Sequence, residues 1–272
     1  MALPHEGKVA IVTGSSRGIG KATALQFARD GADVVVCART VSEGGAWPGT
    51  IGETAALVEK EGRRALALKM DVTSDEDIAN VVETTMREFG RIDILVNNAG
   101  LTGNDAVNPP EEYGRFIGGP VSLLDDFYRI NVRGPYVLAQ LAAAHMAEAG
   151  GGAIVNVSSG VARVPSPPTA EGPSRGGGGG FGFMGQLYGI SKAALDRMSG
   201  GLAQELWAKN IGVVTIYPGF TAVERAIVQG RDVSRAESPD VSAKAIAFVC
   251  REPLAHTGQI YRAKELVDQN GL

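Results

Sequence analysis

The sequence predicts an α/β fold in which a parallel sheet of about seven strands carries helices on both faces. Short apolar runs alternate with segments of helical spacing, and runs such as Val9–Thr13 and Ile92–Val96 are apolar at almost every position. Strands of that kind are buried on both faces, as in parallel sheets whose crossovers are helices. A length of 272 residues suits one such unit, so we expect a single doubly wound domain over residues 1–272.

The first half of the chain repeats a strand, a turn and a helix. A glycine-rich turn follows the first strand, and the next helix is apolar at Ala24 and Phe27 and ends at Gly31. The sequence Thr-Ser-Asp-Glu at 73–76 has the form of a capping box and predicts a helix start. The expected strands are Val9–Thr13, Val34–Cys37, Ala65–Met70 and Ile92–Val96, and the expected helices are Lys21–Asp30, one between Gly52 and Gly62, and one from Thr73 to Phe89.

The second half continues the alternation with longer helices. Right-handed crossovers place these helices on both faces of the sheet, and ligands of such folds bind at the carboxyl ends of the strands. The strand order we expect is 3-2-1-4-5-6-7. The expected helices are Ser122–Ala149, Tyr188–Lys209 and Ala243–Cys250, and the expected strands are Ala153–Val157, Val213–Tyr217 and Gln259–Arg262.

Two long segments interrupt the alternation. Residues 102–120 are polar and contain proline and glycine, and residues 160–187 hold several prolines and a run of five glycines. Loops of this length in a compact domain are usually lids, binding loops or disordered segments. Pro165–Pro168 also fits a Pro-x-x-Pro ligand, although we favour a coincidence within a loop.

Composition excludes several classes of function. The net charge is −4 and the chain has no polybasic run, so binding to nucleic acid or to an anionic membrane is not expected. Cys37 and Cys250 are far apart and the three histidines are scattered, which indicates neither a disulfide framework nor a metal site. The N-terminus lacks the pattern of a signal peptide, and no apolar stretch reaches the length of a membrane span. We expect a soluble, cytoplasmic protein acting on a small molecule.

Tyr188 and Lys192 are the most informative pair of side chains. On a helix, positions i and i+4 share one face, so the phenol and the ammonium can lie side by side. A nearby positive charge favours the phenolate, so we expect Lys192 and a cationic cofactor ring to lower the tyrosine pKa from about 10 toward neutrality. Such a tyrosine could exchange protons at neutral pH. The spacing alone is weak evidence, because it arises by chance in many proteins.

The glycine turn strengthens this interpretation. The sequence Thr-Gly-Ser-Ser-Arg-Gly-Ile-Gly at 13–20 follows a strand and opens a helix, where backbone N–H groups can approach a pyrophosphate. It resembles the motif of the short-chain dehydrogenase/reductase family at every fixed position. The other motifs of that family are met in order by Asp71-Val72, Asn97–Gly100, Asn131, Ser159, Tyr188 with Lys192, and Pro218-Gly219.

The resemblance implies a Rossmann-type fold, a nicotinamide cofactor and a set of site residues. Asn131, Ser159, Tyr188 and Lys192 would be catalytic. Tyr188 would exchange the proton with the carbonyl oxygen while hydride transfers, Ser159 would hold that oxygen, Lys192 would bond the nicotinamide ribose, and Asn131 would support a relay water. The expected cofactor contacts are Gly14, Ser16, Arg17, Gly18, Ile19, Gly20, Arg39, Asp71, Val72, Asn98, Ala99, Gly100, Tyr188, Lys192, Pro218, Gly219 and Thr221.

The end of the second strand bears on the choice of cofactor. A carboxylate there accepts hydrogen bonds from a free ribose, but this chain has Ala38-Arg39-Thr40. Arg39, helped by Arg17, could bind a 2′-phosphate, which favours NADP(H) over NAD(H). The alternative is that both arginines are solvated surface residues.

The chain departs from the family pattern at two places. Val223 replaces the usual threonine after Pro218, with Thr221 nearby. The interval from Ser159 to Tyr188 is about twice the family's usual length, which places the 160–187 insertion beside the substrate mouth as a lid or pocket wall. A surface insertion without functional effect is the alternative.

The expected function is therefore NADP(H)-dependent interconversion of a carbonyl and an alcohol. A faint similarity to hydroxysteroid dehydrogenase-like members suggests a medium-sized hydrophobic substrate. Alternatives are an NAD-dependent alcohol dehydrogenase and a catalytically silent dinucleotide sensor or scaffold on the same fold. Enoyl reduction is disfavoured, because those relatives space tyrosine and lysine more widely. The family commonly assembles through its two long helices, so we expect a homodimer or homotetramer.

Overall fold

The computed structural model describes residues 3–44, 47–102, 116–167 and 183–272. Within these ranges the strands form one parallel seven-stranded sheet in the order β3-β2-β1-β4-β5-β6-β7, which confirms the predicted order. Most of the 102–120 segment and the centre of the 160–187 insertion, with Pro168, lie outside the described residues. The strands are β1 (Val9–Thr13), β2 (Asp33–Ala38), β3 (Ala65–Lys69), β4 (Ile94–Asn97), β5 (Gly152–Val157), β6 (Ile211–Tyr217) and β7 (Ile260–Arg262).

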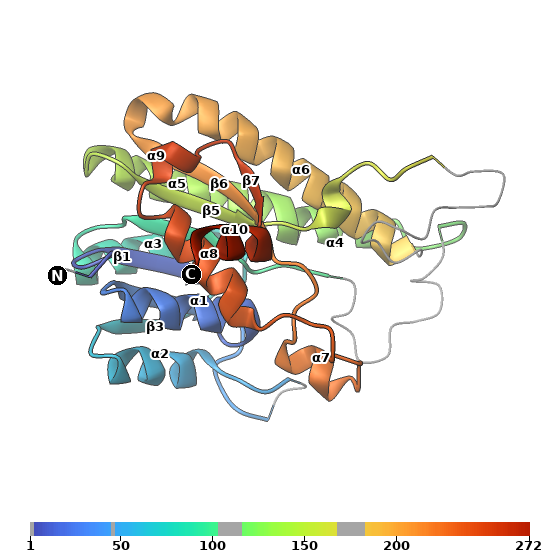
Figure 1. Ribbon diagram of the computed structural model, residues 1–272, viewed down its shortest axis with the longest axis horizontal. Helices are drawn as coiled ribbons and strands as arrows, with labels where there is room; N and C mark the ends of the chain where they lie inside the picture. The colour runs from blue at the N-terminus through green and yellow to red at the C-terminus, as the bar shows by residue number, and fades with distance from the viewer. Residues whose placement is uncertain (1–2, 45–46, 103–115, 168–182) are drawn as a thin grey trace.

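Helices cover both faces of the sheet (Figure 1). On one face α1, α2, α8 and α10 enclose an apolar core, and α3, α5 and α6 enclose a second core on the other face. The helices are α1 (Gly18–Arg29), α2 (Ile51–Lys60), α3 (Asp75–Phe89), α4 (Ser122–Tyr128), α5 (Gly134–Glu148), α6 (Phe183–Glu205), α7 (Glu224–Val228), α8 (Pro239–Val249), α9 (Pro253–His256) and α10 (Ala263–Asn270).

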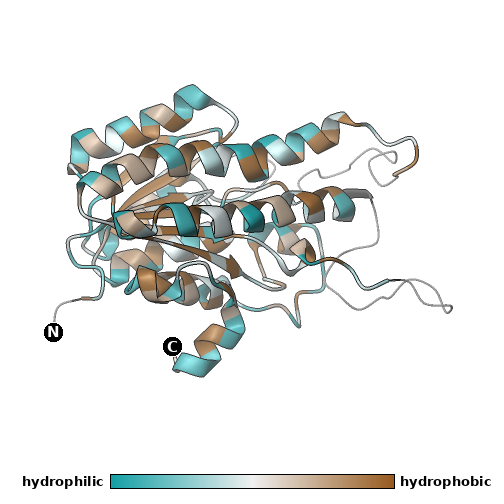
Figure 2. Ribbon diagram, turned by 90° about the horizontal axis from the view of Figure 1, so that it is seen from above, coloured by the Kyte–Doolittle hydropathy of each residue, from teal (hydrophilic) through white to brown (hydrophobic). Residues whose placement is uncertain are grey.

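Strand β1 shows why the runs are apolar throughout. Ala10 and Val12 point into one core, while Val9 and Ile11 point into the other, because successive side chains of a strand alternate between faces. The strands are accordingly mostly apolar in Figure 2, whereas the helices alternate between polar and apolar residues. No helix in the described ranges is both long and apolar enough to cross a bilayer.

Two element boundaries differ from the prediction in ways that affect the site. The helix expected at Ser122–Ala149 is interrupted, because a π-helical turn, η2 (Arg129–Arg133), joins α4 to α5. Helix α6 begins at Phe183, five residues before Tyr188, so Tyr188 and Lys192 lie inside a helix and not at its start. The first helix also begins earlier than expected, at Gly18, directly from the glycine turn.

The capping residues were partly misassigned. Helix α3 is capped by Ser74, whose side chain accepts from the backbone N–H of Asp77, so the cap lies one residue after the predicted Thr73. The reciprocal bond of a capping box does not form, because the Asp77 side chain accepts from the backbone of Asp71. A complete capping box forms instead at Thr50 and Glu53 and begins α2. The proline and glycines just before this box, Pro48 and Gly49 among them, obscure the helix start in the sequence.

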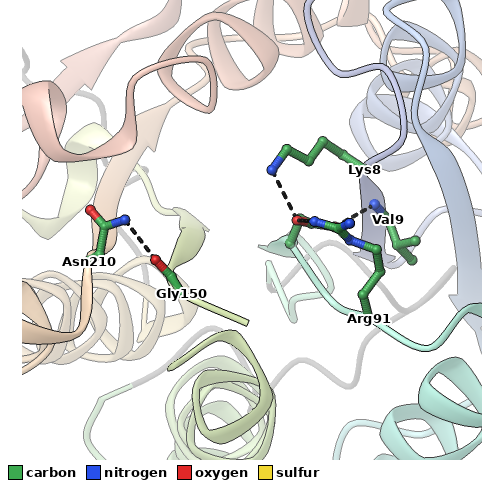
Figure 3. A network of polar contacts seen from close by, with 6 residues as sticks. Lys8, Val9, Arg91, Gly150 and Asn210 are labelled. Carbon is green, nitrogen blue, oxygen red and sulfur yellow. Dashed lines mark hydrogen bonds and ion pairs between the residues drawn. The ribbon is translucent and has the colours of Figure 1, made fainter. Parts of the chain in front are cut away.

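At the amino ends of the strands a polar cluster holds the sheet edge. Asp93 precedes β4 and accepts hydrogen bonds from Lys8, from the backbone of Val9 and from Nε and Nη2 of Arg91 (Figure 3). Nearby, the Asn210 side chain donates to the carbonyl of Gly150 over 2.8 Å. The opposite edge, at the carboxyl ends, carries the site.

Candidate active site

At Gly14 and Gly20, the glycine turn between β1 and α1 leaves no room for a side chain. Gly14 and Gly18 have φ values of 66° and 55°, in the left-handed region. A Cβ on Gly20 would lie 2.4 Å from the carbonyl oxygen of Gly14. The Asn98 side chain donates to the carbonyl of Thr13 over 2.8 Å and ties the end of β4 to the turn. The N-terminus of α1 is therefore held rigidly at the edge of the sheet, where its dipole favours an anion.

A cavity of about 1270 Å³ opens along the carboxyl ends of the strands. It exceeds the roughly 300–1,000 Å³ usual for small-molecule sites, which suits a dinucleotide together with a second molecule. Nearly all predicted site residues line it, namely Gly14, Ser16, Arg17, Gly18, Ile19, Arg39, Asp71, Val72, Asn98, Ala99, Gly100, Ser159, Tyr188, Lys192, Pro218, Gly219 and Thr221. Gly20 and Asn131 lie behind this lining and support it.

Three of the four predicted catalytic residues meet at one end of the cavity. The Ser159 hydroxyl forms a side-chain hydrogen bond with the Tyr188 phenol. The Lys192 ammonium lies 5.7 Å from the centre of the Tyr188 ring and donates to the carbonyl of Val157 over 2.8 Å. Ser158, the neighbouring serine, is buried and directs its hydroxyl to the backbone of Lys192. The geometry thus favours Ser159 over Ser158 as the serine that contacts a ligand.

Burial dominates the electrostatics of this end. Burial raises the pKa of the Tyr188 phenol to about 12, against a smaller lowering by the Ser159 hydrogen bond. Burial lowers the pKa of the Lys192 ammonium to about 8, against the opposing charge of Asp196. The protein's own groups alone do not lower the tyrosine pKa, and the expectation that Lys192 and a cationic cofactor ring do so together stays a prediction. The phenol holds its proton at neutral pH, and it is the lysine that titrates near neutrality.

Asn131 occupies the π-helical turn η2 and is fully buried. Its side chain exchanges hydrogen bonds with the backbone of Leu101 and donates to the Ser191 hydroxyl. A Cβ on Gly100 would lie 3.2 Å from Asn131 Oδ1 and 3.6 Å from Lys192 Nζ, so both side chains crowd the same glycine. π-Helical turns are frequent at functional sites, and here the turn carries Asn131 beneath the lysine.

The other end of the cavity carries exposed charges. Arg39 is exposed. Burial would raise the pKa of the nearby Asp71, but the hydrogen bonds from Thr73 and the charge of Arg39 lower that pKa overall. Arg17 behaves differently from the expectation. Its guanidinium donates to the carbonyls of Pro48 and Gly49 and to the Thr40 hydroxyl, so most of its donors brace the 40–49 loop. A 2′-phosphate would depend chiefly on Arg39.

The segment after β6 closes over the glycine turn. Gly219 has a φ of 84°, and Thr221 forms a bridge with Glu237 while its hydroxyl donates to the Gly219 carbonyl. Val223 lies within 3.1 Å of where a Cβ on Gly18 would be, so the residue that replaces the usual threonine packs against the turn.

Sequence interpretation missed three residues at this edge. Glu224 accepts a hydrogen bond from the backbone N–H of Gly18 over 2.8 Å, which places a carboxylate at the N-terminus of α1. Asp196 lies one turn beyond Lys192 on α6 and accepts a hydrogen bond from the Tyr217 hydroxyl at the end of β6. The i, i+4, i+8 spacing of Tyr188, Lys192 and Asp196 was a usable signal. The Glu224 contact joins residues 206 positions apart and left no local pattern.

This fold and site define an oxidoreductase of the dinucleotide-binding class. The short chain dehydrogenase family matches residues 8–171, and the chain belongs to that family. An uncharacterized oxidoreductase of Methylorubrum extorquens is 34% identical over 255 residues, which cover 93% of this chain and 86% of that protein.

Two further proteins similar to this chain have names that refer to a steroid and to a sugar. Hydroxysteroid dehydrogenase-like protein 2 of Danio rerio is 31% identical over 99% of this chain, and the match spans 61% of that longer protein. The crystal structure of L-sorbose reductase from Gluconobacter frateurii, complexed with NADPH and L-sorbose, is similar with a TM-score of 0.76 and 30% identity. That likeness covers 96% of this chain and 97% of the other.

Proposed function

We propose that this chain is an NADP(H)-dependent oxidoreductase that interconverts a carbonyl and an alcohol. The observation that carries the proposal is the convergence of Ser159, Tyr188 and Lys192 at one end of a cavity whose other end holds the glycine turn and Arg39. The volume and the lining of that cavity support a dinucleotide lying across the carboxyl ends of the strands.

The residues present fit such a cofactor. The backbone N–H groups at the start of α1 would hold the pyrophosphate, and Asp71 and Val72 would contact the adenine. Ala99, Gly100, Pro218 and Gly219 would border the nicotinamide, with Thr221 beside it. Arg39 would pair with a 2′-phosphate, and the NADPH bound to L-sorbose reductase supports that choice. When bound, the nicotinamide supplies or accepts the hydride.

The side chains handle the proton and the carbonyl oxygen. Because burial keeps the Tyr188 phenol protonated at neutral pH, Tyr188 suits the donor of a proton to the carbonyl oxygen during reduction. Ser159, already hydrogen-bonded to that phenol, would hold the same oxygen. Lys192 would contact the nicotinamide ribose and carry positive charge beneath the phenol. Asn131 would act indirectly, by fixing Leu101 and Ser191 next to the lysine.

The substrate would enter beside the insertion. Gly160, Val161 and Gly185, at the described ends of residues 160–187, line the cavity together with the half-exposed Phe220. These mainly apolar groups support a medium-sized hydrophobic ketone or secondary alcohol, and they support the proposal that the insertion forms a wall of the substrate pocket. Self-association through α4, α5 and α6 is supported by the exposed Leu124, Tyr128, Tyr136 and Ile190. The single-domain organisation and the cytoplasmic location stay predictions.

An NAD-dependent alcohol dehydrogenase is the second candidate. The observation that favours it is the engagement of Arg17 with the 40–49 loop, which leaves Arg39 as the main cation for a 2′-phosphate. Replacing Arg39 with serine distinguishes the two candidates. If NADP(H) is the cofactor, Arg39→Ser should weaken NADPH binding about tenfold and leave NADH binding nearly unchanged, because one charge-assisted contact is lost. Equal NADPH affinity in both proteins, measured by fluorescence titration, would favour the NAD-dependent enzyme.

The catalytic proposal is tested with Tyr188→Phe. We expect turnover of a panel of ketones and aldehydes to be abolished while NADPH binding stays nearly intact, because only the phenolic proton is removed. Tyr261→Phe, on β7 and outside the cavity lining, is the matched control and should keep full activity. Retention of more than about a tenth of the rate in Tyr188→Phe would refute the role of the phenol.

A further inference from the structure

A polar cluster adjoins the catalytic end of the cavity, where Tyr217 is part of the lining. Asp196 belongs to α6, one turn beyond Lys192, and accepts a hydrogen bond from the hydroxyl of Tyr217 at the end of β6. The Arg163 guanidinium lies 5.8 Å from the centre of the Tyr217 ring. The cluster therefore joins α6, β6 and the segment after β5 immediately beneath the lysine.

The two oxygens of Asp196 have different surroundings. Oδ2 accepts from Tyr217, whereas Oδ1 is shielded from solvent. The Ser158 hydroxyl, which donates to the carbonyl of Lys192, also stabilises the ionised carboxylate. Asp196 follows Lys192 by four residues on one helix, so the two side chains share a face of α6 and the charge of Asp196 acts on the ammonium.

The groups around Lys192 leave Asp196 as its main counter-charge. Helix α6 contributes Tyr188 and Asp196, and β6 contributes Tyr217 against Asp196. Arg163 also acts on Asp196, and its charge favours the ionised carboxylate. The other neighbours named by the contacts, Val157, Gly100 and Asn131, are not ionisable.

We propose that Asp196 is a positioning residue for Lys192, and that its carboxylate, held by the Tyr217 hydroxyl, keeps the lysine in its charged form at neutral pH. The inference rests on the proposed function, since it explains how a lysine that is only 4% exposed can act as an ammonium. Burial raises the pKa of Asp196, and the hydrogen bonds from Ser158 and Tyr217 and the charges of Lys192 and Arg163 oppose that rise. Burial lowers the pKa of Lys192 and the charge of Asp196 opposes that lowering, while burial and the hydrogen bond to Asp196 raise the pKa of Tyr217.

The test follows the titration of Lys192 directly. The chain is labelled with ¹³C,¹⁵N-lysine, and Lys192→Met identifies the Lys192 resonance in NMR spectra. In Asp196→Asn the ammonium should lose its proton about one pH unit lower than in the wild type, because a nearby negative charge has been removed. Tyr217→Phe, which keeps the carboxylate but removes its donor, should cause a smaller shift in the same direction. Glu205→Gln removes an exposed carboxylate at the far end of the same helix and should cause none.

The same variants are then assayed for NADPH oxidation across pH 6–10. In Asp196→Asn, the limb of the kcat profile that reports Lys192 should move with the NMR titration, whereas a purely structural role would lower the rate at every pH without moving the limb. An unchanged Lys192 titration in folded Asp196→Asn overturns the inference. If Asp196→Asn does not fold, an unchanged titration in Tyr217→Phe overturns it. A wild type without activity on any carbonyl would instead sink the proposed function, and the NMR result would still decide the role of Asp196.

Discussion

Two aspartates at opposite ends of the strands, the buried Asp93 and the half-buried Asp196, have pKa values shifted in opposite directions. At the amino ends of the strands, Asp93 accepts four hydrogen bonds from Lys8, Val9 and Arg91. Burial would raise its pKa, but these donors lower the pKa overall. At the carboxyl ends, burial raises the pKa of Asp196, and the hydrogen bonds from Ser158 and Tyr217 do not offset that rise.

The difference separates charge that stabilises the fold from charge that serves a site. A fully paired carboxylate contributes to stability, because its donors compensate for lost hydration. A buried lysine such as Lys192, whose main counter-charge is a single carboxylate, destabilises the folded state. Such a charge is retained where it takes part in binding or catalysis. Substitutions at the amino ends of the strands should therefore lower the free energy of unfolding and leave kcat nearly unchanged. Substitutions around Lys192 at the carboxyl ends should lower kcat and leave the free energy of unfolding nearly unchanged.

The largest expected effect is on the activity of Lys192→Met. Methionine fills a similar volume without charge, so we expect kcat to fall by about a thousandfold or more, because the charge beneath the phenol is lost. The free energy of unfolding at pH 7 should stay the same or rise by about 1 kcal/mol, since a buried charge is removed at the cost of one hydrogen bond to Val157. Steady-state kinetics and urea denaturation measure the two quantities. A fall of several kcal/mol in the free energy of unfolding of Lys192→Met, alongside the loss of kcat, would contradict the contrast between the two ends of the strands.

Asp93→Asn should give the opposite pair of results. We expect the free energy of unfolding to fall by about 3 kcal/mol, because charge-assisted bonds from Arg91 and Lys8 to a buried group are lost. The kcat of the folded protein should remain within about twofold of the wild type, since the change is at the far edge of the sheet. Glu59→Gln, at an exposed position on α2, is the control and should change neither quantity.

The fold could be predicted from the sequence further than the site could. Continuous apolar runs predicted the central strands, because a strand buried on both faces leaves a local pattern, and the doubly wound fold predicted the strand order. The positions of Tyr188 and Ser159 followed from motifs in the same way. The direction of the Tyr188 pKa did not, because it depends on how deeply α6 is buried against β5, a property of the packed molecule. Asp196, Tyr217 and Glu224 became visible only when elements distant in sequence were brought together.

The pH dependence of stability gives a third test. Lys192 has a folded pKa of about 8 against about 10.4 when unfolded, so the unfolded state binds more protons between these values and stability rises with pH there. The wild type should therefore gain about 2 kcal/mol of stability relative to Lys192→Met from pH 7 to pH 10, so the variant that is equally or slightly more stable at pH 7 should be the less stable protein at pH 10. Asp93 has a lowered folded pKa, so its contribution is present above about pH 4 and is lost as the pH falls further. Urea titrations across the pH range measure both, and a difference that stays constant above pH 8 would contradict the burial of a charged lysine.

The smallest expected effect concerns Glu224, a carboxylate placed where the proposed pyrophosphate would bind. Its oxygen accepts from the Gly18 N–H at the start of α1, so it competes with a second anion for the same helix terminus. Glu224→Gln should raise NADPH affinity about threefold, because the repulsion between two anions is reduced, and should weaken the salt dependence of binding. The same change should cost about 0.5 kcal/mol of stability, since the helix loses a favourable charge. Calorimetric titration at two salt concentrations, with Glu205→Gln as a distant control of equal charge, measures the effect. Unchanged affinity would mean that the Glu224 carboxylate stabilises α1 as Asp93 stabilises β4, and the contrast between the two edges would then hold only for the cluster around Lys192.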